Sequence, residues 1–222
     1  MSVPLNIRTL LNSWFGENTY VVWRPGANEA LVIDPGIDLG RDLEPLRELL
    51  GDEGLTVVAI LNTHGHGDHI GGNEALKQAY PSAPLVIGEN EKHLLTDANA
   101  NLSAMFGFPI VSPAADRTVR EGDVLEYAGI RLEVLEVPGH SPGHVVFLHR
   151  SEPSLVFGGD VLFRGSIGRT DFPGSNGGLL LTGIRNKVFA LPDDTVVYPG
   201  HGPTTTTGHE KCTNPYVGEG AF

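Results

Sequence analysis

Cysteine is almost absent from this 222-residue chain, in which Cys212 is the single cysteine. An intramolecular disulfide needs two cysteines, so the fold cannot depend on one. Cys212 has no neighbouring base and no predicted helix start beside it, and we therefore expect an inert thiol.

Long hydrophobic runs and an excess of positive charge are also missing. No apolar run approaches the roughly 20 residues of a membrane span, and residues 1–6 lack the basic and then apolar pattern of a signal peptide. Fifteen Lys and Arg against 27 Asp and Glu give a net charge of −12, which disfavours nucleic acid and anionic membranes as partners. We expect a cytoplasmic protein that acts on a small molecule; its oligomeric state stays open.

Several catalytic motifs are absent too. The chain has no Gly-x-Ser-x-Gly elbow, no phosphate-binding loop of the Gly-x-x-x-x-Gly-Lys type and no dinucleotide-binding fingerprint. Hydrophobic residues nevertheless make up 40% of the chain, which is ordinary for a globular protein. Length and composition predict a single domain over residues 1–222.

The order of the apolar patterns predicts an α/β fold. Strand-type runs lie at 5–11, 19–23, 30–33, 57–61, 85–87, 124–127, 131–137, 145–149, 155–157 and 195–198. Helical patterns lie at 43–50, 73–80, 89–97 and 176–191, and residues 98–113 predict a loop that covers the site. This order favours two mixed sheets faced by helices.

The residues that suggest chemistry are histidines and aspartates placed directly after predicted strands. The set is His64, His66, Asp68, His69, His140, Asp160 and His201. Three histidines and an aspartate within six residues are hard to explain by packing, because an apolar core would not accept them unpaired. Imidazole and carboxylate ligands suit zinc, iron and manganese. The pattern predicts a metal site at the strand ends.

The His-x-His-x-Asp-His run, followed by a later His, Asp and His, resembles the metallo-β-lactamase superfamily over nearly the whole chain. The resemblance implies an αββα sandwich of two mixed β-sheets flanked by helices, with two divalent metal ions, most simply zinc, between the sheet edges. It implies that His64, His66 and His140 hold the first metal, that Asp68, His69 and His201 hold the second, and that Asp160 bridges both. Asp68 and Asp160 are thereby also the implied catalytic residues, since two metals can activate a shared water. Asp34 matches a further aspartate of the family, which would orient a ligand imidazole; a turn-initiating aspartate is the alternative.

Finer motifs look like the glyoxalase II-like branch, in its short single-domain form. They are the stretches Pro138–His144, Gly159–Phe163, Gly168–Phe172 and Pro199–Pro203. The resemblance implies hydrolysis of an acyl thioester such as S-D-lactoylglutathione. Longer members place a Lys and a Tyr where this chain has Arg169 and Asp171. Arg169 and Arg164 are candidate substrate binders, with surface or Asp171-paired arginines as the alternative.

The main alternative is a persulfide dioxygenase of the same fold, which would hold one iron on His64, His140 and Asp160. A non-catalytic module that merely kept the fold is a third reading, disfavoured by the full ligand set. His144 is expected to be a hydrogen-bonded histidine at a strand start. We expect His93, His149 and His209 not to be ligands.

Overall fold

A computed structural model describes residues 4–221 of the chain. One sheet contains β1 (Asn6–Leu11), β2 (Asn18–Trp23), β3 (Glu29–Ile33), β4 (Thr56–Leu61), β5 (Leu85–Gly88) and β6 (Arg117–Val119). The other contains β7 (Val124–Tyr127), β8 (Ile130–Glu136), β9 (Val145–His149), β10 (Leu155–Gly159), β13 (Val196–Pro199) and β14 (Thr205–Thr206), and β11 (Leu162–Phe163) and β12 (Ser166–Ile167) form a small hairpin. The helices are α1 (Ile37–Arg41), α2 (Glu44–Glu53), α3 (Gly67–Ile70), α4 (Asn73–Ala79), α5 (Gly177–Gly183) and α6 (Thr207–Thr213).

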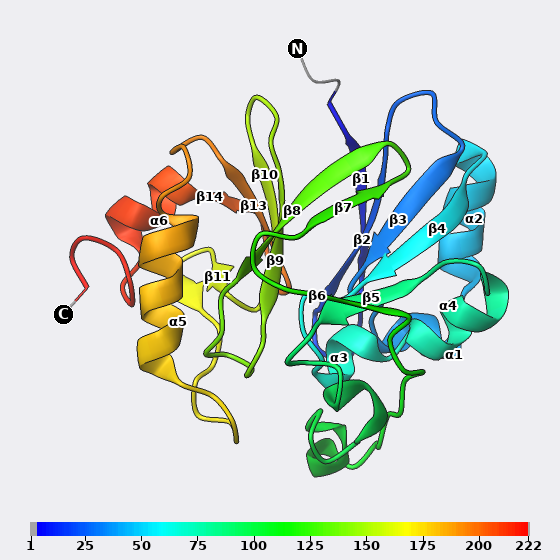
Figure 1. The fold of residues 1–222 in the computed structure, drawn as a ribbon, viewed down its shortest axis with the longest axis horizontal. Coiled ribbons are helices and arrows are strands. Elements are labelled where there is room, and N and C mark those ends of the chain that lie inside the picture. The colour runs from blue at the N-terminus through cyan, green and yellow to red at the C-terminus, as the bar shows by residue number, and fades with distance from the viewer. Residues whose placement is uncertain (1–3, 222) are drawn as a thin grey trace.

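The two six-stranded sheets stand face to face, and helices cover their outer sides (Figure 1). The strand order is β1-β2-β3-β4-β5-β6 in the first sheet and β14-β13-β10-β9-β8-β7 in the second. Both sheets are mixed: β3 to β6 run parallel after an antiparallel start, and β10 is parallel to β13 but antiparallel to β9. The predicted αββα sandwich is confirmed.

Strand β2 shows why the first sheet is buried on both faces. Tyr20 and Val22 point into the core between the sheets, whereas Val21 and Trp23 pack in the layer under α1, α2 and α4. Successive side chains of a strand point to opposite faces, so an apolar residue at every position fits a strand covered on both sides.

The second sheet repeats this arrangement. Phe147 of β9 lies in the core between the sheets, while Val146 and Leu148 pack on the outer side with Leu180 of α5. Asn176 caps α5, because its side chain accepts a hydrogen bond from the Leu179 amide. The helix predicted over 176–191 is present but shorter: it begins at Gly177, directly after its cap, and ends in a π-helical turn over Ile184–Val188.

The predicted helix over 89–97 is wrong. This segment consists of turns and a short 3₁₀ helix over Leu94–Thr96. Its hydrogen bonds span three residues, as from the Leu94 amide to the Glu91 carbonyl, and the Glu91 side chain turns inward to the ligand loops. Strand β6, three residues long, was not predicted.

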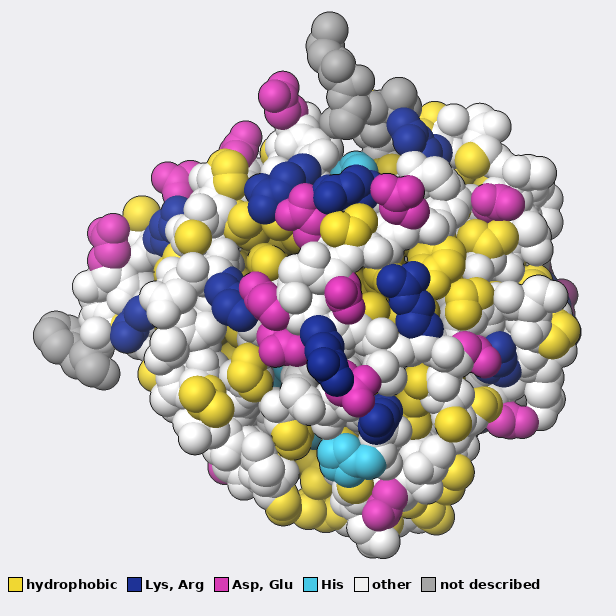
Figure 2. Space-filling model, viewed as in Figure 1, with side chains coloured by type: hydrophobic (Ala, Val, Ile, Leu, Met, Phe, Trp, Pro, Cys, Tyr) yellow, Lys and Arg dark blue, Asp and Glu magenta, His cyan; other side chains and the backbone are white. Residues whose placement is uncertain are grey.

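Helix length and surface charge each describe a further property of the molecule. No helix within residues 4–221 is long and apolar enough to cross a membrane. On the face shown in Figure 2, Lys and Arg side chains lie among Asp and Glu side chains, so this face presents mixed charge.

Candidate metal centre

Four loops carry the predicted ligands to one edge of the sandwich. They follow β4, β8, β10 and β13, so both sheets contribute. Backbone and side-chain hydrogen bonds tie the sheets together at this edge: the Asn18 amide donates to the Gly200 carbonyl (2.7 Å), and the Asn18 side chain donates to the carbonyls of Pro199 (3.0 Å) and Gly202 (2.8 Å). Strand ends provide rigid platforms for such loops.

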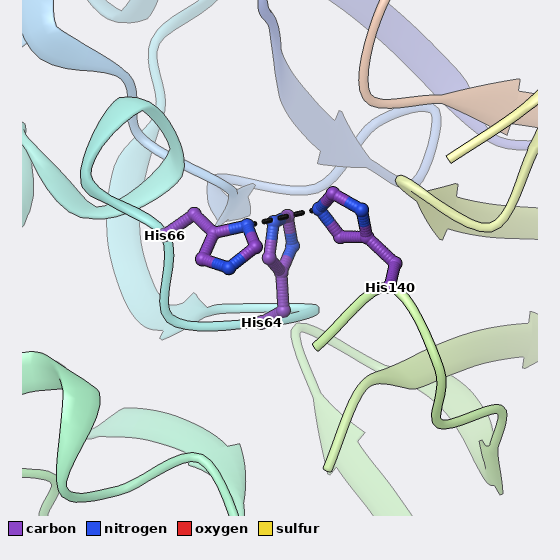
Figure 3. A group of neighbouring side chains, drawn as sticks. All are labelled: His64, His66 and His140. Atoms are coloured by element: carbon purple, nitrogen blue, oxygen red, sulfur yellow. Dashed lines mark hydrogen bonds between the residues drawn. The ribbon is translucent and has the colours of Figure 1, made fainter. Parts of the chain in front are cut away.

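The first group of ligands contains His64, His66 and His140, all buried. Their ligand atoms lie within 4.8 Å of one another. Figure 3 shows the three rings converging, with His64 and His66 on the loop after β4 and His140 on the loop after β8. His66 Nδ1 and His140 Nε2 are 2.9 Å apart. Two ring nitrogens this close repel unless a proton or a cation lies between them.

The second group contains Asp68, His69 and His201, again with ligand atoms within 4.8 Å of one another. His201 Nε2 lies 3.3 Å from Asp68 Oδ2, and His69 Nε2 lies 3.7 Å from the same oxygen. Asp68 and His69 belong to the short helix α3, which starts immediately after His66.

Asp160 stands between the two groups. Its Oδ1 is 3.4 Å from His69 Nε2, and its Oδ2 is 3.5 Å from both His140 Nε2 and His201 Nε2. One carboxylate therefore faces both groups, in the position expected of a bridging ligand. Gly200 leaves the space for it, because a Cβ there would lie 2.2 Å from Asp160 Oδ1.

Buried polar atoms without partners indicate what the site accommodates. His64 Nε2, His69 Nε2 and Asp160 Oδ1 are buried and make no hydrogen bond within the described residues. Leaving such atoms unpaired is costly, whereas nitrogen and carboxylate donors are suitable ligands for borderline divalent ions. The donor set fits two divalent ions, one at each group.

Hydrogen bonds to backbone carbonyls fix which ring nitrogen of His140 and His201 faces the centre. His140 Nδ1 bonds the Arg169 carbonyl (2.9 Å), and His201 Nδ1 bonds the Phe15 carbonyl (3.1 Å). A carbonyl accepts a proton, so Nδ1 carries the hydrogen and Nε2 presents its lone pair to the centre.

Asp34 orients the ring of His69 in the same way, as the sequence suggested. Its Oδ2 lies 3.3 Å from His69 Nδ1, and Asp34 also accepts hydrogen bonds from the Thr63 amide (2.7 Å) and hydroxyl (2.6 Å). The Asp34 backbone has φ of 48°, a conformation that aspartate adopts more readily than most residues.

The electrostatics favour cation binding. Burial and the neighbouring histidines hold the pKa of His64 well below its usual value, and they lower that of His66 to about 3. Both rings are therefore neutral, which is the form that binds metal. Burial acts to raise the pKa of Asp160, but the facing imidazoles of His69 and His201 outweigh it, so this carboxyl is ionised. Burial acts to lower the pKa values of His69 and His201, but the Asp68 and Asp160 carboxylates outweigh it and raise them, so a cation bound there would take the place of the protons on Nε2.

Glu91 is a residue of the site that sequence reasoning missed. It is fully buried, and its carboxylate accepts hydrogen bonds from the Gly65 amide (2.8 Å) and the Gly143 amide (2.5 Å). Gly65 separates two ligands of the first group, and Gly143 lies three residues after the third. Glu91 thus joins both loops of that group; no local pattern marks it.

His144 is a hydrogen-bonded histidine at the start of a strand, as expected. It precedes β9, and its Nε2 accepts from the Asp160 amide (3.1 Å). Its ring stacks on His64 at 4.6 Å between centroids. His93, His149 and His209 belong to neither ligand group.

A cavity of about 280 Å³ opens above the ligands. Five phenylalanines line it together with the exposed faces of the ligands: Phe15, Phe106, Phe108, Phe163 and Phe172. Arg169 also lines the cavity and binds Asp171 through two hydrogen bonds, of 2.9 and 2.8 Å. Arg164 is exposed and does not line it.

This fold and this ligand arrangement agree with the comparisons. The chain belongs to the metallo-β-lactamase superfamily, whose family model matches residues 12–201. Within that superfamily it is a metal-dependent hydrolase.

Three known proteins are particularly similar. Hydroxyacylglutathione hydrolase GloC of Haemophilus influenzae is 38% identical over 216 residues, covering 96% of this chain and 98% of GloC. The crystal structure of BLEG-1 B3 metallo-beta-lactamase matches with a TM-score of 0.88 and 38% identity, covering 96% of this chain and 99% of that one. A di-iron-bound form of TTHA1623 matches with a TM-score of 0.81 and 37% identity, covering 95% and 100%.

Proposed function

We propose that this protein is a two-metal thioesterase that hydrolyses an acyl thioester, with S-D-lactoylglutathione as the first substrate to test. The observation that carries the proposal is the lining of the cavity. Apart from the predicted ligands, Arg169 is the single titratable side chain among its described lining residues. A leaving group would therefore depart without a dedicated proton donor, which suits a thiolate better than an amine or an alkoxide.

In the proposed reaction the C–S bond of the thioester breaks and a C–O bond forms, which yields a carboxylic acid and a free thiol. When bound, two divalent ions would supply hydroxide near neutral pH and polarise the substrate carbonyl. His64, His66 and His140 would hold one ion; Asp68, His69 and His201 would hold the other. Asp160 would set their spacing.

The remaining residues act by positioning. Asp34 and the carbonyls of Arg169 and Phe15 hold the rings of His69, His140 and His201 with Nε2 toward the centre. The five phenylalanines make much of the cavity wall apolar. Electrostatic interactions are stronger beside an apolar wall than in bulk water.

The second ligand group also bears on the one-iron alternative. A persulfide dioxygenase would require His64, His140 and Asp160 alone, whereas Asp68, His69 and His201 gather at a second centre and face Asp160. The similarity to hydroxyacylglutathione hydrolase GloC supports the same choice. We therefore favour the hydrolase.

The test is thiol release by protein loaded separately with zinc, iron or manganese. Substrates are S-D-lactoylglutathione, neutral acyl thioesters, a lactone and a β-lactam. We expect thioesters to be cleaved with the highest kcat/KM. Exposed Cys212 contributes one thiol per chain to the thiol count, and a substrate-free sample corrects for it. Faster β-lactam cleavage, or oxygen consumption with glutathione persulfide at one iron per chain, would refute the proposal.

A further inference from the structure

Aromatic side chains remain exposed at the mouth of the cavity. Trp14 is 51% exposed, Phe106 47% and Phe15 36%. With Phe108 they form a connected cluster, here called the aromatic rim: Trp14 and Phe108 are 5.4 Å apart between ring centroids, and Phe15 is 5.7 Å from both Phe106 and Phe108. Exposed apolar clusters of this kind commonly mark binding surfaces.

The aromatic rim joins two segments that are distant in sequence. Trp14 and Phe15 lie in the connection between β1 and β2. Phe106 ends a short 3₁₀ helix over Ser103–Phe106, within the segment 98–113 that was predicted as a loop, and Phe108 follows it. Since Trp14, Phe15 and Phe106 keep a large part of their surface exposed, their rings are available to cover a bound ligand.

The aromatic rim is continuous with the metal centre. Phe15, Phe106 and Phe108 line the same cavity as Asp68 and His201. A substrate whose carbonyl lies at the centre would extend its adjoining group over these rings.

Apart from the two ions proposed at the centre, the described cavity lining offers one cationic side chain to an anionic group. Arg41 is not among the lining residues, and its guanidinium lies 3.9 Å from the ring centroid of Trp14. Arg169 is the one Lys or Arg among the described lining residues, and its guanidinium already pairs with Asp171. The Arg169 guanidinium also lies 4.2 Å from the ring centroid of Phe172. A substrate carboxylate would have to compete with Asp171.

We infer that the aromatic rim is a subsite for an alkyl or aryl group of the substrate, so that the enzyme prefers thioesters with an apolar acyl or thiol portion. This inference rests on the proposed thioesterase function. On this inference Phe106 and Phe108 determine substrate specificity, and Trp14 lies beside the bound alkyl or aryl group.

The first experiment compares neutral thioesters that differ in one alkyl chain. Hexanoyl and acetyl thioesters of N-acetylcysteamine vary the acyl side, and acetyl thioesters of hexanethiol and ethanethiol vary the thiol side. A fully buried methylene is worth roughly fourfold in affinity, so four methylenes half-buried on the rim give about 15-fold. We expect the longer chain to raise kcat/KM by about 15-fold on one of the two sides, acyl or thiol.

Variants then test whether the preference for the longer chain depends on the aromatic rim. Phe106→Ala should reduce the preference for the longer chain, measured as the ratio of the two kcat/KM values within each variant, to about threefold or less. Tyr216→Ala is the matched control, because Tyr216 is 55% exposed and does not line the cavity. It should retain the full preference.

Binding can also be followed without turnover. Trp23 is 3% exposed, so a fluorescence change on ligand binding would come from Trp14. We expect an uncleavable hexyl thioether of N-acetylcysteamine to shift the emission of metal-loaded protein, and Trp14→Phe to abolish the shift. The methyl thioether should have little effect at the same concentration.

The outcomes separate this inference from the proposed function. If no thioester is cleaved, the function is wrong. If thioesters are cleaved with equal kcat/KM regardless of chain length and the fluorescence does not respond, the inference is overturned and the function stands. If S-D-lactoylglutathione is preferred over all neutral thioesters and Arg169→Ala raises its KM several-fold, carboxylate recognition dominates and the inference is also overturned.

Discussion

Replacing Glu91 with glutamine tests whether a buried side chain that contacts no predicted ligand controls metal affinity. The carboxylate accepts one hydrogen bond from each of the two loops that carry His64, His66 and His140. Glutamine keeps one acceptor but places an NH₂ group against the other backbone amide. One charge-assisted hydrogen bond is lost and two donors face each other.

The magnitude follows from the number of hydrogen bonds. A hydrogen bond to a charged group is worth about 1.5–3 kcal/mol when removal leaves its buried partner unsatisfied. If most of this loss falls on the metal-bound arrangement, the affinity of the first group falls roughly 10- to 100-fold. Glu91→Ala removes both hydrogen bonds and should weaken binding further.

The assay is competition for zinc against a chromophoric chelator, together with metal content after dialysis and the Tm of the metal-free protein. Glu210→Gln is the matched control, since Glu210 is also fully buried and accepts from a backbone amide, that of Gly165 (2.9 Å). It should lower Tm without weakening metal binding. Wild-type zinc affinity in Glu91→Gln would refute the reasoning.

Three other predictions concern the same centre. Removing metal with a chelator should lower Tm by about 5–10 °C, since a ligand at 100 times its Kd stabilises by about 2.7 kcal/mol; an unchanged Tm after verified metal loss would contradict the two-ion assignment. Asp160→Ala should reduce hydrolysis to near background with an unchanged far-UV circular dichroism spectrum, and full activity at full metal content would exclude the bridging role. Asp34→Asn should weaken binding at the second group roughly 10- to 100-fold, because asparagine keeps one acceptor oxygen for the Thr63 amide and its NH₂ group, in place of Oδ2, cannot accept from His69 Nδ1; wild-type occupancy by metal titration would show that another group orients His69.

The ligand set could be predicted because its signal is local. Four of its members lie within six residues, and the rest directly follow strands whose apolar pattern is plain. The buried strands 57–61 and 145–149 were equally clear, since apolar residues on both faces fit no exposed element.

What could not be predicted depends on contacts between distant segments. Glu91 bonds residues that are 26 and 52 positions away, and nothing near it in sequence marks them. The same segment was predicted as a helix, since its local pattern could not show that Glu91 turns inward. The aromatic rim combines residues near 15 with residues near 107, and such a cluster becomes visible only once the loops are placed.

The division of the chain between the two sheets has a consequence for how the protein assembles. Residues 6–119 supply all six strands of the first sheet, and residues 124–206 supply those of the second. The first half carries His64, His66, Asp68 and His69, whereas the second carries His140, Asp160 and His201. Each centre therefore needs both halves, and neither half alone holds a complete one. By linkage, a change that loosens the docking of the halves would also weaken metal binding, and bound metal would in turn hold the halves together. Metal affinity would then report on the interface between the sheets, including core positions such as Phe147 that belong to neither ligand group.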